Sequence, residues 1–193
     1  MIIVKYLKLA LLLFVVVFIS VSCEDDTSDN PLYFIGDSLI ANWDTEFSFP
    51  NRVTHNFGKN GEGVNYISSF NSFEREAILV IEIGTNDIKA NWNEQQLLDY
   101  FALYEKVICN LSGMKVLIIE VLPTSDMQRN KVICDFNRLL NASDAFKTNR
   151  FKVVPAYRLL EENGTLKDDL MRDGLHLNDY GYRILTSVVY KCL

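Results

Sequence analysis

Short stretches of this sequence carry the groups needed for nucleophilic chemistry. Ser38 follows an apolar run, a glycine and an aspartate, and residues 58–63 are rich in glycine. Asn86 follows a second apolar run, and Asp173 stands three residues before His176. A serine, an imidazole, a carboxylate and an amide are the parts of acyl transfer through a covalent intermediate. Ser38 is therefore a candidate nucleophile and His176 a candidate base.

Simpler structural roles compete with these chemical ones. A Gly-Asp-Ser turn at residues 36–38 is also a common way to cap a helix. Asp37 and Asp87 are expected to hold loops together rather than to react. His55, the other histidine of the chain, lies inside a strand-like run and is expected to be structural.

Strands and helices must alternate to position these groups. Apolar or alternating runs predict strands at residues 31–35, 52–57, 77–83, 114–122 and 151–156. Helical spacing or capping residues predict helices over 64–73, 93–111, from about 125 onward, and 180–193, and a helix start that runs into a loop over 40–50. This alternation predicts an α/β fold: a three-layer α/β/α sandwich with about five parallel strands. Groups that follow parallel strands gather at one edge of the sheet, where ligands bind.

Composition limits the class of protein. The 193 residues are 49% hydrophobic, which suits one globular domain, expected over residues 31–193. The formal charge is -6 without a basic cluster, which argues against nucleic acid as a partner. Cys109, Cys134 and Cys192 lack the C-x-x-C spacing of a zinc site. They are expected to be small buried hydrophobes, although two of them could pair.

The N-terminal segment has the pattern of an export signal. Residues 1–22 combine a basic start with an apolar stretch, and small residues precede Cys23. This resembles a bacterial lipoprotein signal, in which Cys23 is lipidated and becomes the mature N-terminus. Residues 23–30 then form an acidic, flexible tether. The expected location is the bacterial cell envelope, with a lipid anchor as the only membrane contact; ordinary secretion with cleavage near Ser22 is the alternative.

Four blocks in order resemble the SGNH hydrolases, also called GDSL esterases and lipases. The blocks are Gly36-Asp37-Ser38-Leu39, Asn56-Phe57-Gly58-Lys59-Asn60-Gly61, Gly84-Thr85-Asn86-Asp87 and Asp173-Gly174-Leu175-His176. The resemblance extends over residues 32 to about 190. It implies the flavodoxin-like fold of that family and a serine esterase activity without a cofactor or a metal.

The resemblance also implies a role for each matching residue. Ser38 attacks an ester carbonyl, His176 transfers the proton, and Asp173 orients the imidazole. The oxyanion is stabilised by the backbone N–H groups of Ser38 and Gly61 and by the side-chain amide of Asn86. One departure follows Gly61, where the family often has Asp-Thr and this chain has Glu-Gly at residues 62–63.

Other hydrolytic classes fit the sequence less well. A standard α/β-hydrolase has Gly-x-Ser-x-Gly at its nucleophile, whereas Ile40 occupies the last glycine position here. No Gly-Lys-Ser/Thr follows the glycine-rich turn, as a phosphate-binding loop requires. Metal hydrolysis could use Asp37, Asp173 and His176, but two histidines leave few good ligands.

The substrate is less sharply indicated than the reaction. A chain of 193 residues has little room for a lid or a long acyl tunnel. Small members of the family that it resembles often act on acetylated sugars, so we expect a monomer acting on short-chain carbohydrate esters. The alternatives are a lipase or lysophospholipase-type acyl hydrolase, and a non-catalytic surface lipoprotein that binds glycans.

Overall fold

The computed structural model describes residues 30–70, 72–73, 76–111 and 115–193. The predicted signal peptide, the lipidation site Cys23 and all of the tether except Asn30 lie outside the described residues.

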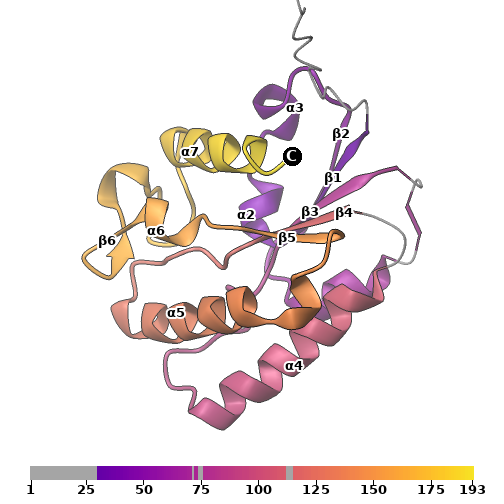
Figure 1. Ribbon diagram of the computed structural model, residues 1–193. Helices are drawn as coiled ribbons and strands as arrows, with labels where there is room; N and C mark the ends of the chain where they lie inside the picture. The colour runs from indigo at the N-terminus through magenta and orange to yellow at the C-terminus, as the bar shows by residue number, and fades with distance from the viewer. Residues whose placement is uncertain (1–29, 71, 74–75, 112–114) are drawn as a thin grey trace, which may run out of the picture.

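A parallel sheet forms the centre of the molecule. Within the described residues its five strands lie in the order β2-β1-β3-β4-β5, and every neighbouring pair is parallel. The strands are β1 (Leu32–Gly36), β2 (Thr54–Gly58), β3 (Ile78–Glu82), β4 (Lys115–Ile119) and β5 (Phe151–Val154). Helices cover both faces, so the predicted three-layer α/β fold is confirmed (Figure 1).

Alternation along the strands explains why helices are needed on both faces. Successive side chains of a strand point to opposite faces. In β1, Ile35 belongs to one buried cluster, while its neighbour Phe34 belongs to the other. Ile81 and Val80 of β3 divide in the same way. Every residue of these two strands is buried, as expected for central strands that pack on both sides.

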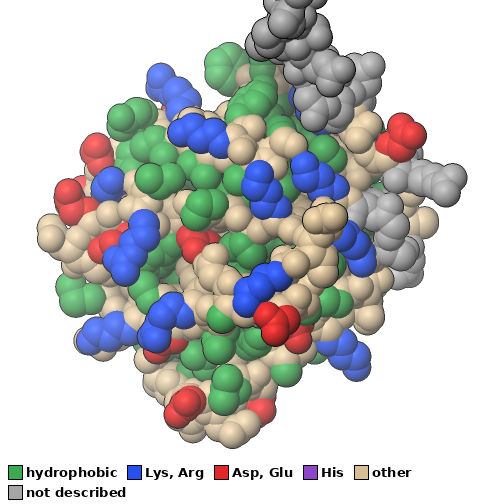
Figure 2. All heavy atoms as spheres, viewed as in Figure 1, with side chains coloured by type: hydrophobic (Ala, Val, Ile, Leu, Met, Phe, Trp, Pro, Cys, Tyr) green, Lys and Arg blue, Asp and Glu red, His purple; other side chains and the backbone are tan. Residues whose placement is uncertain are grey.

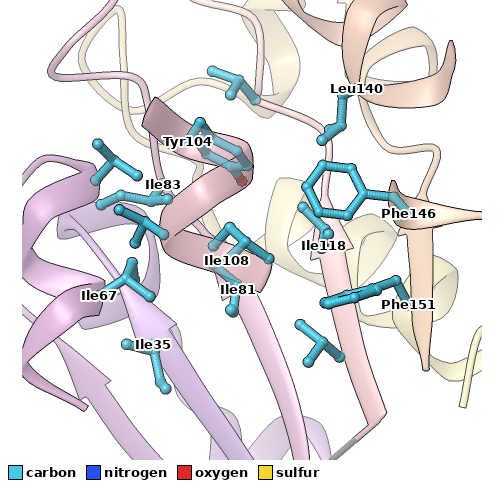
Figure 3. Close-up of a cluster of buried hydrophobic side chains, with 14 of the residues drawn as sticks. Ile35, Ile67, Ile81, Ile83, Tyr104, Ile108, Ile118, Leu140, Phe146 and Phe151 are labelled. Carbon is cyan, nitrogen blue, oxygen red and sulfur yellow. The ribbon is translucent and has the colours of Figure 1, made fainter. Parts of the chain in front are cut away.

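Two groups of helices complete the core. One face is covered by α4 (Glu94–Asn110), α5 (Met127–Ala142) and the 3-10 helix η1 (Val64–Ser69). Figure 3 shows this cluster, where Tyr104 and Ile108 of α4 pack over the isoleucines of the sheet. The other face is covered by α2 (Ser38–Ala41), α3 (Thr45–Ser48), α6 (Tyr157–Leu160) and α7 (Asp179–Tyr190).

Several boundaries differ from the prediction. In the segment 40–50, predicted as a helix start that runs into a loop, α2 ends near Asn42 and Asp44 then caps a separate short helix, α3. Residues 64–69 are a 3-10 helix rather than the start of an α-helix. β4 ends at Ile119, although the apolar run continues to Leu122. The short hairpin of β6 (Glu161–Glu162) and β7 (Thr165–Leu166) was not predicted.

The visible surface carries side chains of both charges. Figure 2 shows Lys and Arg side chains spread among Asp and Glu side chains on the visible face. Cys109, Cys134 and Cys192 are all free; the first two are half-buried and the third is buried. In the part of the chain that the structure describes, no helix has the length and apolar character of a membrane span.

Candidate active site

Ser38 lies at the carboxyl end of β1, held by a tight turn. The Oδ1 atom of Asp37 accepts a hydrogen bond from the N–H of Leu39 at 2.8 Å, so Asp37 caps α2. The side chain of Asn42 donates to the carbonyl oxygen of Ser38 at 2.7 Å. Asp37 therefore caps a helix, as one explanation of the Gly-Asp-Ser turn predicts, and the same cap fixes the position of Ser38.

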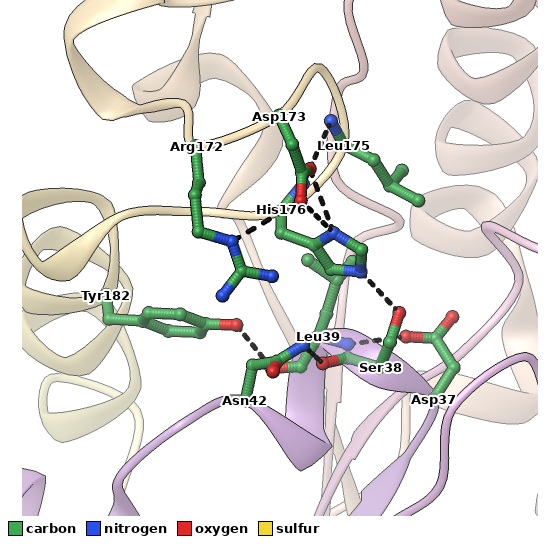
Figure 4. A network of polar contacts seen from close by, with 9 residues as sticks. All are labelled: Asp37, Ser38, Leu39, Asn42, Arg172, Asp173, Leu175, His176 and Tyr182. Atoms are coloured by element: carbon green, nitrogen blue, oxygen red, sulfur yellow. Dashed lines mark hydrogen bonds and ion pairs between the residues drawn. The ribbon is translucent and has the colours of Figure 1, made fainter.

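The structure brings His176, 138 positions away along the chain, to this serine, together with Asp173. His176 Nε2 lies 2.8 Å from Ser38 Oγ. His176 Nδ1 lies 2.9 Å from both carboxylate oxygens of Asp173. Figure 4 shows the three side chains in a line from Asp173 to Ser38. A hydroxyl, an imidazole and a carboxylate in this order form a nucleophile, a base and a group that orients the base.

Electrostatics favour one tautomer of this imidazole. Hydrogen bonds from the backbone N–H and from the ring of His176 hold the pKa of the Asp173 carboxyl below its usual range. Asp173 is therefore ionised at neutral pH, and the Nδ1 proton of His176 is donated to it. The lone pair of Nε2 is then left to accept the hydroxyl proton of Ser38.

The histidine sits on a loop that closes on itself. An isolated bridge joins Met171 to Leu177, and the N–H of Arg172 donates to the carbonyl oxygen of His176 at 2.8 Å. Gly174, at φ +86°, accepts a hydrogen bond from the N–H of Ser125 at 2.8 Å. These bonds fix the loop against the segment that follows β4. They therefore hold the Asp173 carboxylate and the His176 imidazole in place.

Asn86 joins the nucleophile turn to the glycine-rich loop. Its Nδ2 atom lies 2.9 Å from the carbonyl oxygen of Glu62 and 3.2 Å from Asp37 Oδ2. Gly61, next to Glu62, has φ +78°, and no heavy atom lies within 4 Å of where a Cβ would stand. The predicted oxyanion residues thus lie on two loops connected through Asn86, with open space above Gly61.

Asp87 packs against the loop at residues 62–63, where the chain departs from the usual family pattern. Its Oδ2 atom accepts hydrogen bonds from the N–H of Val64 and from the hydroxyl of Tyr100, both at 2.8 Å. A Cβ on Gly63 would overlap the Asp87 carboxylate. Asp87 therefore holds loops together, as expected, and Gly63 leaves room for it.

His55 has the structural role predicted for it. It lies in β2, and its ring centroid is 4.6 Å from that of Tyr33 in β1. Among the described residues, no group of three or more His, Cys, Asp or Glu side chains has the arrangement of a metal site.

Three neighbours of the site were missed in the sequence. Arg172 Nε lies 3.3 Å from Asp173 Oδ2, and the hydroxyl of Tyr182 donates to the carbonyl oxygen of Leu39 at 2.9 Å. Glu82, a fully buried acid at the end of β3, lies beside Asp37. For Glu82 the signal was present, because it is the one charged residue in the apolar run 77–83.

The strand order places the site where ligands bind in open α/β sheets. β2 lies on one side of β1, and β3, β4 and β5 follow on the other side. The strand order therefore reverses at β1. Ser38 follows β1, and Asn86 follows β3. The crevice at such a switch point, outside the carboxyl ends of the strands, is the general ligand site of this architecture.

Comparison with known proteins places the chain in a family. A model of the GDSL-like lipase/acylhydrolase family matches residues 34–184, more than half of the chain. The chain belongs to the GDSL-like lipase/acylhydrolase family. The four blocks that suggested SGNH hydrolases all fall within this match, so that prediction is confirmed for the family. No curated protein matches the sequence.

Several solved structures of bacterial or metagenomic hydrolases share the architecture. A GDSL-like lipase from Bacteroides thetaiotaomicron is 21% identical, with a TM-score of 0.63 over 85% of this chain and 87% of that one. The lipase Lip_vut3 from a goat rumen metagenome is 15% identical, with a TM-score of 0.66 over 84% and 96%. An acetyl xylan esterase from Geobacillus stearothermophilus is 15% identical, with a TM-score of 0.61 over 84% and 93%. At these identities the similarity establishes the SGNH hydrolase fold.

Proposed function

We propose that this GDSL-family protein is a serine ester hydrolase that works through an acyl-enzyme. Ser38 attacks the carbonyl carbon of the ester, and His176 takes the hydroxyl proton and gives it to the leaving alcohol. Asp173 stabilises the imidazolium that forms. Water then attacks the acyl-enzyme with His176 as base and releases the acid. The observation that carries this proposal is the 2.8 Å contact between Ser38 Oγ and His176 Nε2, with Asp173 on the far side of the ring.

The negative charge of the tetrahedral intermediate needs donors that are already in place. We assign this role to the backbone N–H groups of Ser38 and Gly61 and to the Asn86 amide. The open space above Gly61 supports the assignment, because a substrate oxygen has to approach the backbone there. The position of Asn86 between the two loops supports it as well.

Hydrolysis of a short-chain nitrophenyl ester tests the reaction. We expect the wild type to release nitrophenol and Ser38→Ala to lose at least about 10,000-fold in kcat. Asn141→Ala, which changes an exposed amide on α5, serves as the matched control and should keep full activity. Equal activity of wild type and Ser38→Ala would overturn the proposal. Inactivity of both, with glycan binding retained, would favour the binding protein instead.

For the substrate we propose short-chain, O-acetyl carbohydrate esters. A groove of about 640 Å³ begins next to the nucleophile turn at Asn42 and runs between α3 and α7. It is lined by charged and aromatic side chains, among them Asp44, Arg183 and Phe47, and the Phe47 ring is 79% exposed. Polar groups beside an exposed ring suit a sugar better than a long acyl chain. The fold shared with an acetyl xylan esterase is consistent with this choice.

A series of esters with acyl chains of increasing length tests the substrate class. We expect kcat/KM to be highest for acetyl esters, and Phe47→Ala to raise KM for acetylated oligosaccharides but not for nitrophenyl acetate. Val53→Ala, at another exposed hydrophobic position, is the control. A preference for long acyl chains would contradict the carbohydrate proposal and favour a lipase.

We also propose that the protein is a monomeric lipoprotein of the bacterial cell envelope. This rests on the sequence of residues 1–22, on Cys23 and on the acidic segment 23–30. Membrane fractionation of cells expressing the wild type and Cys23→Ala tests it, and release of only the variant into the soluble fraction is expected.

A further inference from the structure

A second carboxyl group lies under the nucleophile turn and has no part in the reaction proposed above. Glu82 is the last residue of β3, directly opposite Gly36 of β1 in the parallel ladder. Its exposed fraction is 0%, although a carboxylate is among the groups most costly to bury. A fully buried acid at this position requires neighbouring groups that stabilise it.

Donors for this carboxyl group are missing among the described residues. The Leu122 N–H and the Thr85 hydroxyl are near, but no N–H or hydroxyl donor of the described residues meets the distance and angle of a hydrogen bond to either oxygen of Glu82. Asp37 follows Gly36, the residue opposite Glu82 in the ladder, and its carboxyl interacts with that of Glu82. Two carboxyl groups can bond to one another only when one of them carries a proton.

The partners of Asp37 decide which group carries that proton. Asp37 Oδ1 accepts from the N–H of Leu39, and Asp37 Oδ2 lies 3.2 Å from the amide nitrogen of Asn86. Both bonds favour an ionised Asp37. Glu82 has no such donors, so it is the member of the pair that is left neutral.

We propose that Glu82 is a positioning residue that keeps its proton at neutral pH and donates it to Asp37, which holds the Leu39 N–H and the Asn86 amide. Burial, followed by the nearby charge of Asp37, raises the pKa of Glu82 well above its usual range, in agreement with this assignment. Burial likewise raises the pKa of Asp37 to about 6, a rise that its hydrogen bonds from Leu39 and Glu82 limit.

The surroundings of the pair leave Asp37 as the natural acceptor. From α4, the buried Tyr104 hydroxyl has no hydrogen-bond partner in the part of the chain that the structure describes, and the Tyr100 hydroxyl is bound to Asp87. From α7, the Tyr182 hydroxyl is bound to the backbone of the nucleophile turn. The cations that interact with the pair do so through Asp37: His176, when protonated, and Arg129 of α5.

This arrangement has a consequence for the oxyanion site, and here the inference rests on the proposed function. The Asn86 amide has two hydrogens, and its nitrogen already contacts Glu62 and Asp37. One of these contacts has to yield when an oxyanion forms, and the contact with Asp37 is the longer. A proton donated by Glu82 draws negative charge away from the Asp37 carboxylate. This weakens the hydrogen bond between Asp37 and the Asn86 amide. Glu82 therefore acts in the transition state, and its removal should lower kcat rather than raise KM.

Carbon-13 NMR of the glutamate carboxyl groups tests the protonation directly. We expect one resonance with the chemical shift of a protonated acid at pH 7, and we expect Glu82→Gln to remove it. If the resonance removed by Glu82→Gln has the shift of an ionised carboxylate at pH 7, the proposal is wrong. This measurement needs no substrate, so its outcome does not depend on whether the protein is an esterase.

Kinetics with nitrophenyl acetate test the positioning role. Glu82→Gln keeps a neutral donor for Asp37 and should keep kcat within about threefold. Glu82→Leu removes the donor and should lower kcat at least about tenfold with KM unchanged, the effect of losing one hydrogen bond to a charged group. Equal kcat for both variants, or an effect on KM alone, would contradict the role.

A control variant separates catalysis from stability. Asn137 of α5 is another buried polar side chain, bonded to the N–H and carbonyl of Val121 in the segment that follows β4. Asn137→Ala should lower the Tm and leave the kcat of the folded enzyme unchanged. If Glu82→Leu does not fold, the NMR result and the kcat of Glu82→Gln relative to wild type still test the proposal. A neutral Glu82 together with a near-normal kcat of Glu82→Gln supports it. An ionised Glu82 overturns it.

Discussion

At the scale of residues, the position of the Ser38 hydroxyl depends on side chains that never touch the substrate. Asp37, Asn42 and Tyr182 each bond to the backbone of the turn that carries it. Together they fix the direction in which the turn leaves β1. The site is therefore built from backbone held by side chains, with few groups free to move before substrate arrives.

Asn86 is the residue whose loss should separate catalysis from binding. We predict that Asn86→Ala lowers kcat about 100- to 1,000-fold with little change in KM, since the amide is proposed to act on the oxyanion alone. Steady-state kinetics on nitrophenyl acetate measure both constants, with Asn141→Ala as the control. A change confined to KM would assign Asn86 to ground-state binding.

The chemistry of the site was more predictable than its support. Ser38, Asn86, Asp173 and His176 stood out as candidates because they fall in family blocks, and the structure brings Asp173 and His176 to Ser38. The proximity of Glu82 to Asp37 could not be found, because it depends on the register between β1 and β3. A single acid in an apolar run indicates a special environment but does not name the partner.

At the scale of elements, Gly36 and Gly61 should respond to substitution in opposite ways. A Cβ on Gly36 would overlap the backbone carbonyl oxygen of Glu82 in the neighbouring strand, which cannot move aside without breaking the sheet. Gly61 has only a positive φ to satisfy, with open space around it. Gly36 is therefore needed for the packing of β1 against β3, and Gly61 is needed for the backbone conformation of the site loop.

We therefore predict that Gly36→Ala costs at least about 3 kcal/mol of unfolding free energy, whereas Gly61→Ala costs about 1–2 kcal/mol. Urea unfolding measures both. The activity of the folded fraction should fall more in Gly61→Ala, because the new methyl group occupies the approach to the backbone. Equal stability losses would show that β1 and β3 can separate at Gly36.

Elements were predictable where burial is complete and less so elsewhere. β1 and β3 form continuous apolar runs and were recognised with nearly correct ends. The strands of the hairpin, β6 and β7, are two residues long and β6 is two glutamates, so the hairpin lacks an apolar pattern. Its turn, Asn163-Gly164, is a strong hairpin signal that could have been used, and both residues have positive φ.

At the scale of the whole molecule, the Glu82–Asp37 pair links stability to pH. Both groups have a pKa raised above the unfolded value, so the folded protein binds more protons than the unfolded chain between the two values. Their contribution is complete below about pH 4, near the unfolded values, and is lost as the pH rises through the folded ones.

Glu82→Gln should remove the glutamate part of this dependence, because an amide does not titrate. We predict that the unfolding free energy of Glu82→Gln, relative to wild type, increases between pH 5 and pH 8 by up to about 1.4 kcal/mol per pH unit. Denaturant titrations at several pH values measure the difference. A constant difference across this range would mean that Glu82 does not titrate differently in the folded and unfolded states.

The direction of β1 has a practical consequence. Leu32 begins the strand and Ser38 follows its end, so the chain enters the sheet at the edge opposite the site. Five residues of strand separate the two edges by about 16 Å. A bead, an electrode or a fused reporter attached ahead of residue 31 would lie at the edge of the sheet opposite the site. Immobilised molecules would then present Ser38 to the solution.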